Sequence, residues 1–494
     1  MQFNSIDFLI FFPIVVLIYF IIPRKTRYLW LLIASYYFYM SWNAKYALLI
    51  ALSTLITWVS GLMISRFSSR AAQKSIVALS FASNLGILFF FKYFDFLLEN
   101  VNLVLERFQL QIVENPFDIL LPVGISFYTF QALSYTMDVY RGEVEPEKNP
   151  LKYALFVSFF PQLVAGPIER SKNLLRQVKN VDSIKLWDYD RIASGFILMC
   201  WGMFQKVVIA DRLSIFVDQV WDNLISCGSV ETIAAAFAFS TEIYCDFAGY
   251  SSIAIGAARL MGFELMENFN APYFATSIRQ FWRRWHISLS GWFRDYLYIP
   301  LGGNRKGRVR KQINVMITFL LSGLWHGASW TYVIWGGLHG GYQVVGDLTS
   351  PLREKMNLLF HTDKEAESYR LGQTIFTFLL VTFAWIFFRA ETLEQAIYFL
   401  NRLFTRWNPW NFFNGSLYEF GLDRLECHIL LAGLLLLFCA DMIRERKKED
   451  LGVFLLRQNL WFRWAAVIVM ILGCLVFGVY GVDFDSTQFI YFNF

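Results

Sequence analysis

Charged residues are scarce in this chain. They make up 17% of its 494 residues, whereas hydrophobic residues make up 56%. Soluble globular proteins carry about 25% charged and about 45–50% apolar residues. Aromatic side chains, with 51 Phe, 24 Tyr and 17 Trp, are too numerous for one aqueous core. The composition therefore excludes an ordinary soluble protein and indicates a lipid bilayer as the solvent.

Closely paired cysteines are also lacking. The chain has six Cys and no CxxC pair, so neither a disulfide framework nor a zinc or other metal site is indicated. A cleavable signal is not indicated either. The first residues, MQFNS, contain no basic side chain, and no A-x-A site precedes PRKTR at 23–27. We therefore expect the first apolar run to be a retained helix.

Long apolar runs are abundant. Many windows approach the ~20 apolar residues that cross a hydrocarbon layer of ~30 Å. They are too long and too uniformly apolar for barrel strands, so helices are expected to satisfy their backbone polar groups. We predict an all-α polytopic membrane protein with about 11–13 helices entering the membrane. The windows are 6–23, 28–42, 46–64, 75–92, 118–137, 153–168, 192–209, 231–260, 312–330, 331–346, 373–388, 428–443 and 462–480.

Basic residues gather in a few places, and such clusters mark cytoplasmic loops. The strongest lies within 279–311, where nine Lys and Arg accompany one Asp, giving +8 in a chain of formal net charge +5. A second basic group, within 444–448, follows the apolar run at 428–443. Since one further run, 462–480, comes before the end, we expect the tail at 483–494 to be extracytoplasmic.

The segment FWRRWHISLSGWFRDYLYI, 281–299, has a pattern unlike that of a spanning helix. At about 100° per residue its bulky apolar side chains share one face and most charged ones lie opposite. Such an amphipathic pattern is typical of a helix lying in the membrane interface. His286 lies at the edge of the apolar face. That face comprises Trp282, Trp285, Leu289, Trp292, Phe293 and Tyr296.

A basic loop with glycines, PLGGNRKGRVRK at 300–311, follows this segment. One interpretation is that its charges set the topology and bind anionic membrane lipid. The other is a site for the phosphates of a donor such as coenzyme A at the cytoplasmic mouth. The candidate phosphate-binding residues are Arg283, Arg284, Arg305 and Lys306.

His326 lies deep in the apolar segment 312–346. Ionisable groups in membrane segments are costly and usually face an interior cavity. An imidazole is suited to general-base work near neutral pH; the alternative is a histidine that packs between helices and bonds to a neighbour. His339 would face about 220° away on a continuous helix. We therefore expect His339 to be structural, unless the glycines at 336–337 break the helix.

Two further stretches place polar residues within apolar runs. FFPQLVAGPIER, 159–170, contains Pro-Gln and Gly-Pro pairs, which indicate irregular backbone that lines a cavity or is buried in protein. TEIYCDFAGYSS, 241–252, contains Glu242 and Asp246. Either carboxylate is expected to orient a base or pair with an Arg, and a buried ion pair or hydrogen bond between helices is the alternative.

The stretches 281–305 and SGLWHGASW (322–330) resemble the membrane-bound O-acyltransferase family, in particular its bacterial polysaccharide branch, whose members include alginate acetylases. VAGPIER (164–170) and IYCDFAGYSSIAIG (243–256) also resemble that branch. The resemblance implies one integral-membrane domain over 1–494. Its helices would form a ring around a thinned centre, with a cytoplasmic funnel and an extracytoplasmic one.

The resemblance also implies roles for individual residues. His326 corresponds to the family's central catalytic histidine, and His286 to a second motif histidine near the cytoplasmic funnel. The donor would be acetyl-CoA. The acetyl group would cross the bacterial cytoplasmic (inner) membrane to an extracytoplasmic SGNH-type acetyltransferase partner that modifies an exported polysaccharide such as alginate, cellulose or peptidoglycan. Membrane lipid is a further implied partner, and nucleic acid is not.

Other functions stay open at this point. The branch that D-alanylates teichoic acid shares the scaffold. A transporter would suit intramembrane Glu, Asp and His, although no internal repeat with paired broken helices is visible. A non-catalytic scaffold for polysaccharide export is a third possibility.

The last six residues, FIYFNF, hold four aromatic side chains, one of them Tyr491. One interpretation is an aromatic belt at the outer interface. The other is that Tyr491 reaches His326 and acts as a transient acetyl carrier, since a hydroxyl of pKa near ~10 needs a base to become a nucleophile. The relatives that the chain resembles end on similar aromatic hexapeptides, which favours the second interpretation.

Overall fold

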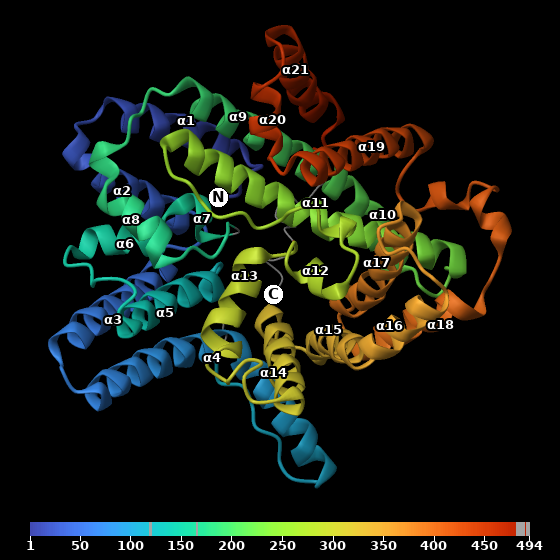
Figure 1. Cartoon of the computed structure of the whole chain (residues 1–494), viewed down its shortest axis with the longest axis horizontal. Helices are drawn as coiled ribbons and strands as arrows, with labels where there is room; N and C mark the ends of the chain where they lie inside the picture. The colour runs from blue at the N-terminus through green and yellow to red at the C-terminus, as the bar shows by residue number, and fades with distance from the viewer. Residues whose placement is uncertain (118–120, 165, 481–489, 491–494) are drawn as a thin grey trace. The chain divides into compact units, whose positions relative to one another are not determined.

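The computed structural model describes residues 1–117, 121–164, 166–480 and 490. Within these ranges every regular element is a helix, which confirms the predicted all-α class. The chain divides into two compact units, Met1–Gly195 with Ala254–Met266, and Phe196–Ile253 with Glu267–Phe494. Figure 1 labels their helices in chain order. One domain over 1–494 remains a prediction.

The first unit is helical in the part that the structure describes. Its α3 packs closely on its neighbours: the Tyr153 hydroxyl donates to Thr57 Oγ1 at 2.8 Å, and a Cβ at Gly61 would lie 2.6 Å from the Tyr135 ring. The helices are α1 (Ile6–Ile21), α2 (Arg27–Met40), α3 (Tyr46–Arg66), α4 (Arg70–Arg107), α5 (Ile125–Arg141), α6 (Pro150–Ser158), α7 (Phe160–Leu163) and α8 (Arg176–Lys179), with η1 (Arg24–Thr26), η2 (Ser171–Leu175) and η3 (Val181–Ser183).

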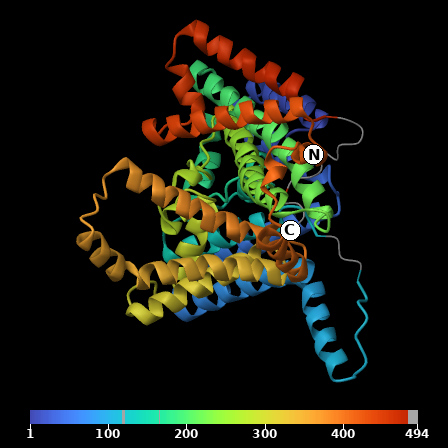
Figure 2. The same cartoon turned by 90° about the vertical axis from the view of Figure 1, so that its right-hand side faces the viewer.

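The second unit carries the histidines singled out above. Two helices, α9 (Tyr189–Met203) and α11 (Ser229–Met261), have residues in both units. Figure 2 shows α19, α20 and α21, in red, following one another at one edge of this unit. Its remaining helices are α10 (Asp211–Asp222), α12 (Ile278–Trp282), α13 (Ile287–Phe293), α14 (Arg308–His326), α15 (Trp330–Leu348), α16 (Ser350–Leu359), α17 (Glu367–Arg389), α18 (Leu393–Thr405), α19 (Arg424–Lys447), α20 (Leu451–Leu456) and α21 (Leu460–Phe477), with η4 (Phe204–Ala210), η5 (Pro272–Phe274), η6 (Arg294–Tyr298), η7 (Pro409–Phe412) and η8 (Ser416–Glu419).

Fewer helices than expected meet the criteria for a full membrane crossing. Among the described residues, six are long and apolar enough, whereas the sequence predicts about 11–13 helices entering the membrane. One reason is that the expected window 153–168 is divided between α6 and α7, which have 9 and 4 residues. The six are Tyr46–Arg66, Arg70–Arg107, Tyr189–Asp222, Glu367–Arg389, Arg424–Lys447 and Leu460–Phe477.

The helices α14 and α15 form a tight antiparallel hairpin. A Cβ at Gly323 would lie 2.2 Å from the carbonyl oxygen of Tyr332, and one at Gly336 would lie 2.2 Å from that of Phe319. Only glycine therefore permits this approach, as is common where membrane helices pack through small residues. The hairpin fixes the end of α14, and with it His326, against α15.

The prediction of one continuous interfacial helix over 281–299 is wrong. The segment forms α12, a break, α13 and then a π-helical turn, η6. His286 occupies the break with φ +42° and ψ 54°, a left-handed conformation that costs a non-glycine residue roughly 1–2 kcal/mol. Five of the six residues on the expected apolar face are buried within the protein, which explains their pattern without a lipid surface: Trp282, Trp285, Leu289, Trp292 and Phe293.

Candidate active site

His326 is the last residue of α14 and is 2% exposed. The helix ends there because Gly327 is extended, with φ −164° and ψ 152°. Ser329 then begins α15 by accepting a hydrogen bond from the Thr331 N–H at 3.3 Å. The short connection between the two helices therefore places an imidazole beside the last carbonyl groups of α14. The negative end of a helix dipole favours positive charge, so this position suits a base that takes up a proton.

Aromatic rings surround the His326 imidazole. The ring centroids of Trp325 and Trp335 each lie 5.0 Å from it, and that of Phe388, on α17, lies 5.3 Å away. Trp335 stacks in turn on Trp385 at 5.6 Å. These contacts leave the ring little room to rotate and surround it with low-dielectric material, in which electrostatic interactions are stronger than in water.

His286 is fully buried beside His326, with the two ring centroids 6.4 Å apart. Its Nδ1 lies 3.0 Å from Asn268 Oδ1. The Asn268 amide nitrogen is engaged in donating to Ser251 Oγ at 3.1 Å, and its Oδ1 also accepts from Ser288 Oγ at 2.9 Å. Because Oδ1 accepts, Nδ1 of His286 carries the proton and Nε2 carries the lone pair. Asn268 thus selects one tautomer of His286.

Burial lowers the pKa of His286 to about 3, so the imidazole is neutral at physiological pH. The backbone helps to hold it. The Ile287 N–H donates to the Asn268 carbonyl at 2.9 Å, and the Ser290 N–H donates to the His286 carbonyl at 2.9 Å. Asn268, which the sequence analysis missed, is therefore the residue that fixes both the ring and the adjoining main chain of His286. Neither its spacing nor its residue type marks it in the sequence.

His339 belongs to the same aromatic cluster, because Trp335 packs between it and His326 with 5.0 Å to each ring centroid. The expectation of opposite faces assumed a continuous helix, whereas the chain breaks at Gly327 and not at 336–337. The Nδ1 of His339 accepts a hydrogen bond from Trp282 Nε1 at 3.2 Å. This bond supports the structural role that we expected for His339.

The candidate phosphate-binding residues differ in their surroundings. Arg283, Arg305 and Lys306 are exposed. Arg284 instead donates to both carboxylate oxygens of Glu445, at 2.5 and 3.1 Å, so its charge is already paired. Three glycines of the basic loop have a positive φ, as turns often require. The values are +107° at Gly302, +54° at Gly303 and +88° at Gly307.

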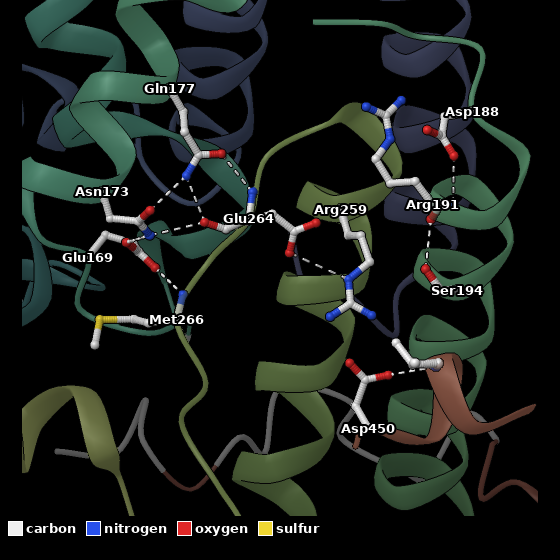
Figure 3. A network of polar contacts seen from close by, with 11 residues as sticks. Glu169, Asn173, Gln177, Asp188, Arg191, Ser194, Arg259, Glu264, Met266 and Asp450 are labelled. Atoms are coloured by element: carbon white, nitrogen blue, oxygen red, sulfur yellow. Dashed lines mark hydrogen bonds and ion pairs between the residues drawn. The ribbon is translucent and has the colours of Figure 1, made fainter. Parts of the chain in front are cut away.

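The VAGPIER motif ends in a polar network within the first unit (Figure 3). Glu169 is fully buried, and its carboxylate accepts from the Met266 N–H at 2.5 Å and from Asn173 Nδ2 at 2.8 Å. Gln177 bridges Asn173 and both main-chain groups of Glu264. The motif residue Glu169 therefore secures the chain segment that follows α11.

The two carboxylates of 241–252, Glu242 and Asp246, are both buried. Asp246 forms an ion pair with Lys206, at 2.7 Å, rather than with an Arg. No group of three or more His, Cys, Asp or Glu side chains that could hold a metal ion occurs within the part of the chain that the structure describes. Tyr491 lies outside the described residues.

Comparison with known proteins identifies the family of the chain. The model of the membrane-bound O-acyltransferase (MBOAT) family matches residues 18–390, which include both His286 and His326. The chain belongs to the membrane-bound O-acyltransferase family. It is therefore an O-acyltransferase, and its apolar helices make it a multi-pass membrane protein.

The proteins to which this chain is similar include enzymes whose names mention a polysaccharide. The chain is 40% identical over 411 residues to a probable alginate O-acetylase of Pseudomonas putida, and the match covers 82% of this chain and 80% of that one. It is 37% identical over 417 residues to a peptidoglycan O-acetyltransferase of Helicobacter pylori, covering 78% and 76%. A teichoic acid D-alanyltransferase of Bacillus subtilis is 29% identical over 236 residues, 45% of this chain and 58% of that one.

Proposed function

We propose that this protein takes an acetyl group from acetyl-CoA in the cytoplasm and passes it across the bacterial cytoplasmic membrane for O-acetylation of an exported polysaccharide. The observation that carries the proposal is the buried pair of His326 and His286, 6.4 Å apart between ring centroids. Similarity to alginate and peptidoglycan O-acetyltransferases supports the acetyl group and the polysaccharide class. The D-alanyl alternative has weaker support, because the match covers less than half of this chain.

The proposed chemistry is acyl transfer. His326 accepts the proton of an attacking hydroxyl, the hydroxyl oxygen bonds to the thioester carbonyl carbon, and the carbon–sulfur bond breaks. The departing thiolate takes up the proton that His326 accepted and leaves as the free thiol of coenzyme A. General-base catalysis supplies ~10²–10⁴-fold of the acceleration, and positioning of the reactants supplies more. His286, through the lone pair on Nε2, orients the hydroxyl that His326 deprotonates.

We further propose Tyr491 as the first acceptor of the acetyl group. An ester on this tyrosine would carry the acetyl group toward the extracytoplasmic face, where the C-terminal tail at 483–494 is proposed to lie. An SGNH-type acetyltransferase would then receive it and modify the polysaccharide. The exposed side chains of Arg283, Arg305 and Lys306 would contact the donor's phosphates. Arg284 would act indirectly, through its ion pair with Glu445.

Isotope transfer tests the function. Purified full-length protein in detergent is incubated with acetyl-CoA labelled in its acetyl group, and release of free thiol and label on the protein are measured. We expect label on Tyr491 in the wild type and none in Tyr491→Phe, which keeps the aromatic ring. Thiol release and normal polysaccharide acetylation in cells by Tyr491→Phe would overturn the carrier role. Absence of turnover with acetyl-CoA, together with turnover of another acyl donor, would overturn the donor assignment.

The basic residues have a test of their own. Replacing Arg305 and Lys306 by Ala should raise KM for acetyl-CoA about tenfold or more and leave KM unchanged for an acetyl thioester without phosphates. Lys355→Ala, an exposed basic residue on α16, is the matched control. Equal changes for both donors would show that the loop does not recognise phosphate.

A further inference from the structure

A buried cluster of charged side chains lies in the second unit. None of its residues takes part in the chemistry proposed above. Lys206 Nζ is 2.7 Å from Asp211 Oδ1 and 2.7 Å from Asp246 Oδ1. All three side chains are at most 3% exposed. One ammonium thus stands between two carboxylates. Since a buried charge is costly unless it is paired and hydrogen-bonded, the carboxylate oxygens require further donors.

The backbone is arranged to bring these groups together. Lys206 lies in the π-helical segment η4, and such segments are frequent at functional sites. A Cβ at Gly202 would lie 2.5 Å from the Gly249 carbonyl oxygen, so glycine allows this stretch to approach α11 closely. The Tyr250 ring lies 5.7 Å from Lys206 Nζ. The cluster is therefore built from η4, the first residue of α10 and the closely packed α11.

The terminal segment of the chain bonds to Asp246 of this cluster at one described residue and to the backbone next to Lys206 at another. The Val479 N–H donates to the Val207 carbonyl in η4 at 2.9 Å. The Ile490 N–H donates to Asp246 Oδ2 at 2.9 Å. Asp246 thus uses one oxygen for Lys206 and the other for a main-chain group of the terminal segment. A hydrogen bond to a charged acceptor in such a dry site is stronger than one between neutral groups.

Asp246 is also adjacent to residues that contact the paired histidines. The ring of Phe247, the next residue on α11, lies 4.7 Å from the His286 ring. One turn further along α11, Ser251 holds Asn268, the partner of His286. The same part of α11 therefore bonds to the terminal segment and supports His286.

We propose that the Lys206–Asp211–Asp246 cluster is a docking site for the C-terminal segment, and that Asp246 is a positioning residue that holds the main chain at Ile490. Lys206 and Asp211 keep the Asp246 carboxylate oriented with one oxygen available to that N–H. Tyr491 directly follows Ile490 in the chain, so the proposed docking would act on the carrier residue through the adjoining main chain. The consequence for acetyl transfer rests on the proposed function, whereas the docking itself does not.

Hydrogen exchange of the full-length protein in detergent tests the docking directly. Ile490→Pro removes the N–H and leaves every core side chain in place; Ile490→Val keeps the N–H. Gln488→Pro adds a proline to the same tail without removing the Ile490 N–H. We expect exchange at Phe492, Asn493 and Phe494 to be about ten- to a hundredfold faster in Ile490→Pro than in either control. Equal exchange in Ile490→Pro and Gln488→Pro would overturn the docking site.

A second measurement separates docking from chemistry. In Ile490→Pro, transfer of labelled acetyl to Tyr491 should fall by a similar factor, while KM for acetyl-CoA stays unchanged because the donor site is intact. Asp246→Asn should also lower acetyl transfer to Tyr491 at unchanged KM for acetyl-CoA, because it alters the acceptor of the same hydrogen bond. If exchange rises and Tyr491 is never labelled even in the wild type, the docking site stands and the carrier role fails. If acetyl transfer occurs on Tyr491 and is equal in Ile490→Pro and Ile490→Val, the positioning role fails.

Discussion

The imidazole rings of His286 and His326 lie 6.4 Å apart although different helices carry them. His326 ends α14, and His286 occupies the break between α12 and α13. Each ring is fixed by a different means: His326 by aromatic side chains and His286 by the amide of Asn268. The two histidines are therefore chemically distinct, and substitutions should separate their roles.

Replacing His326 should strongly slow turnover while the protein stays folded. We expect His326→Gln to lower kcat by about 10²–10⁴-fold, because the general base is lost, with little change in KM for acetyl-CoA. Release of free thiol from acetyl-CoA is the measurement. His339→Gln, in the same aromatic cluster, is the control and should retain much of its kcat. Unchanged thiol release in His326→Gln would remove His326 from the mechanism.

His286 should affect the height of the pH–rate profile and not its position. Its pKa is lowered to about 3 by burial, so it does not change charge between about pH 5 and pH 9. We expect His286→Asn to lower kcat at every pH in that range without shifting the acid limb. Asn tolerates the left-handed backbone, so the variant should fold, whereas His286→Ala combines loss of the ring with strain. A shifted acid limb in His286→Asn would show that His286 ionises during turnover.

Asn268→Ala should impair the enzyme through His286. Without the Oδ1 acceptor, His286 loses the bond that selects its tautomer, and we expect kcat to fall at least tenfold. Ser288→Ala removes another group that bonds to Asn268 but keeps the contact with His286, so a much smaller loss is expected. Rates should be compared with melting temperatures, since a loss of kcat at unchanged melting temperature distinguishes tautomer control from unfolding.

The glycines of the α14–α15 hairpin should tolerate no side chain. Gly323→Ala and Gly336→Ala each place a Cβ 2.2 Å from a carbonyl oxygen, so the helices must separate and His326 must move. We expect each variant to lose about 2 kcal/mol or more of stability and most of its activity. Gly341→Ala, on α15 with nothing within 4 Å of its added Cβ, is the control. Equal thermal stability of Gly336→Ala and Gly341→Ala would contradict the tight packing.

Glu169 should make stability depend on pH. Burial raises its pKa from 4.5 to about 7, against the hydrogen bonds from the Met266 N–H and Asn173 and the nearby charge of Arg170. The folded state then favours the protonated acid. This contribution is fully present below about pH 4.5 and is lost as the pH rises through about 7, amounting to about 3 kcal/mol over that interval.

The matching variant is Glu169→Gln, which keeps the shape and removes the ionisation. The difference in melting temperature between Glu169→Gln and the wild type should be small at pH 4.5 and should grow in favour of the variant up to pH 8. A difference that stays constant with pH would show that Glu169 does not titrate on folding.

The sequence predicts some of these features well, for physical reasons. The apolar composition predicts helices, and the scarcity of ionisable groups in apolar runs makes His326 stand out. The wheel of 281–299 finds the buried face correctly but assumes one helix, because helical periodicity does not reveal a left-handed residue such as His286. Asn268 is invisible for another reason: its role depends on Ser251, Ser288 and His286, which only the tertiary fold brings together.

The number of helices that enter the membrane stays a prediction, because six helices among the described residues meet the criteria for a full crossing and shorter ones are not tested. Hydropathy measures how apolar a segment is and does not say whether lipid or protein surrounds it. The window 331–346, for example, falls on α15, whose Trp335 and His339 are fully buried among other side chains of the protein. A sequence-based count of apolar windows therefore includes segments that other parts of the protein surround.

The α14–α15 hairpin implies an order of assembly. Its contacts join residues close in sequence, so His326 and Trp335 meet with little loss of chain entropy, and such local structure forms fast. The surroundings of His286 require Ser251 and Asn268 from a more distant part of the chain, which is slower to close. During biogenesis, the packing around His326 should therefore form before the packing around His286. On mild heating or in harsh detergent, the packing around His286 should be lost first.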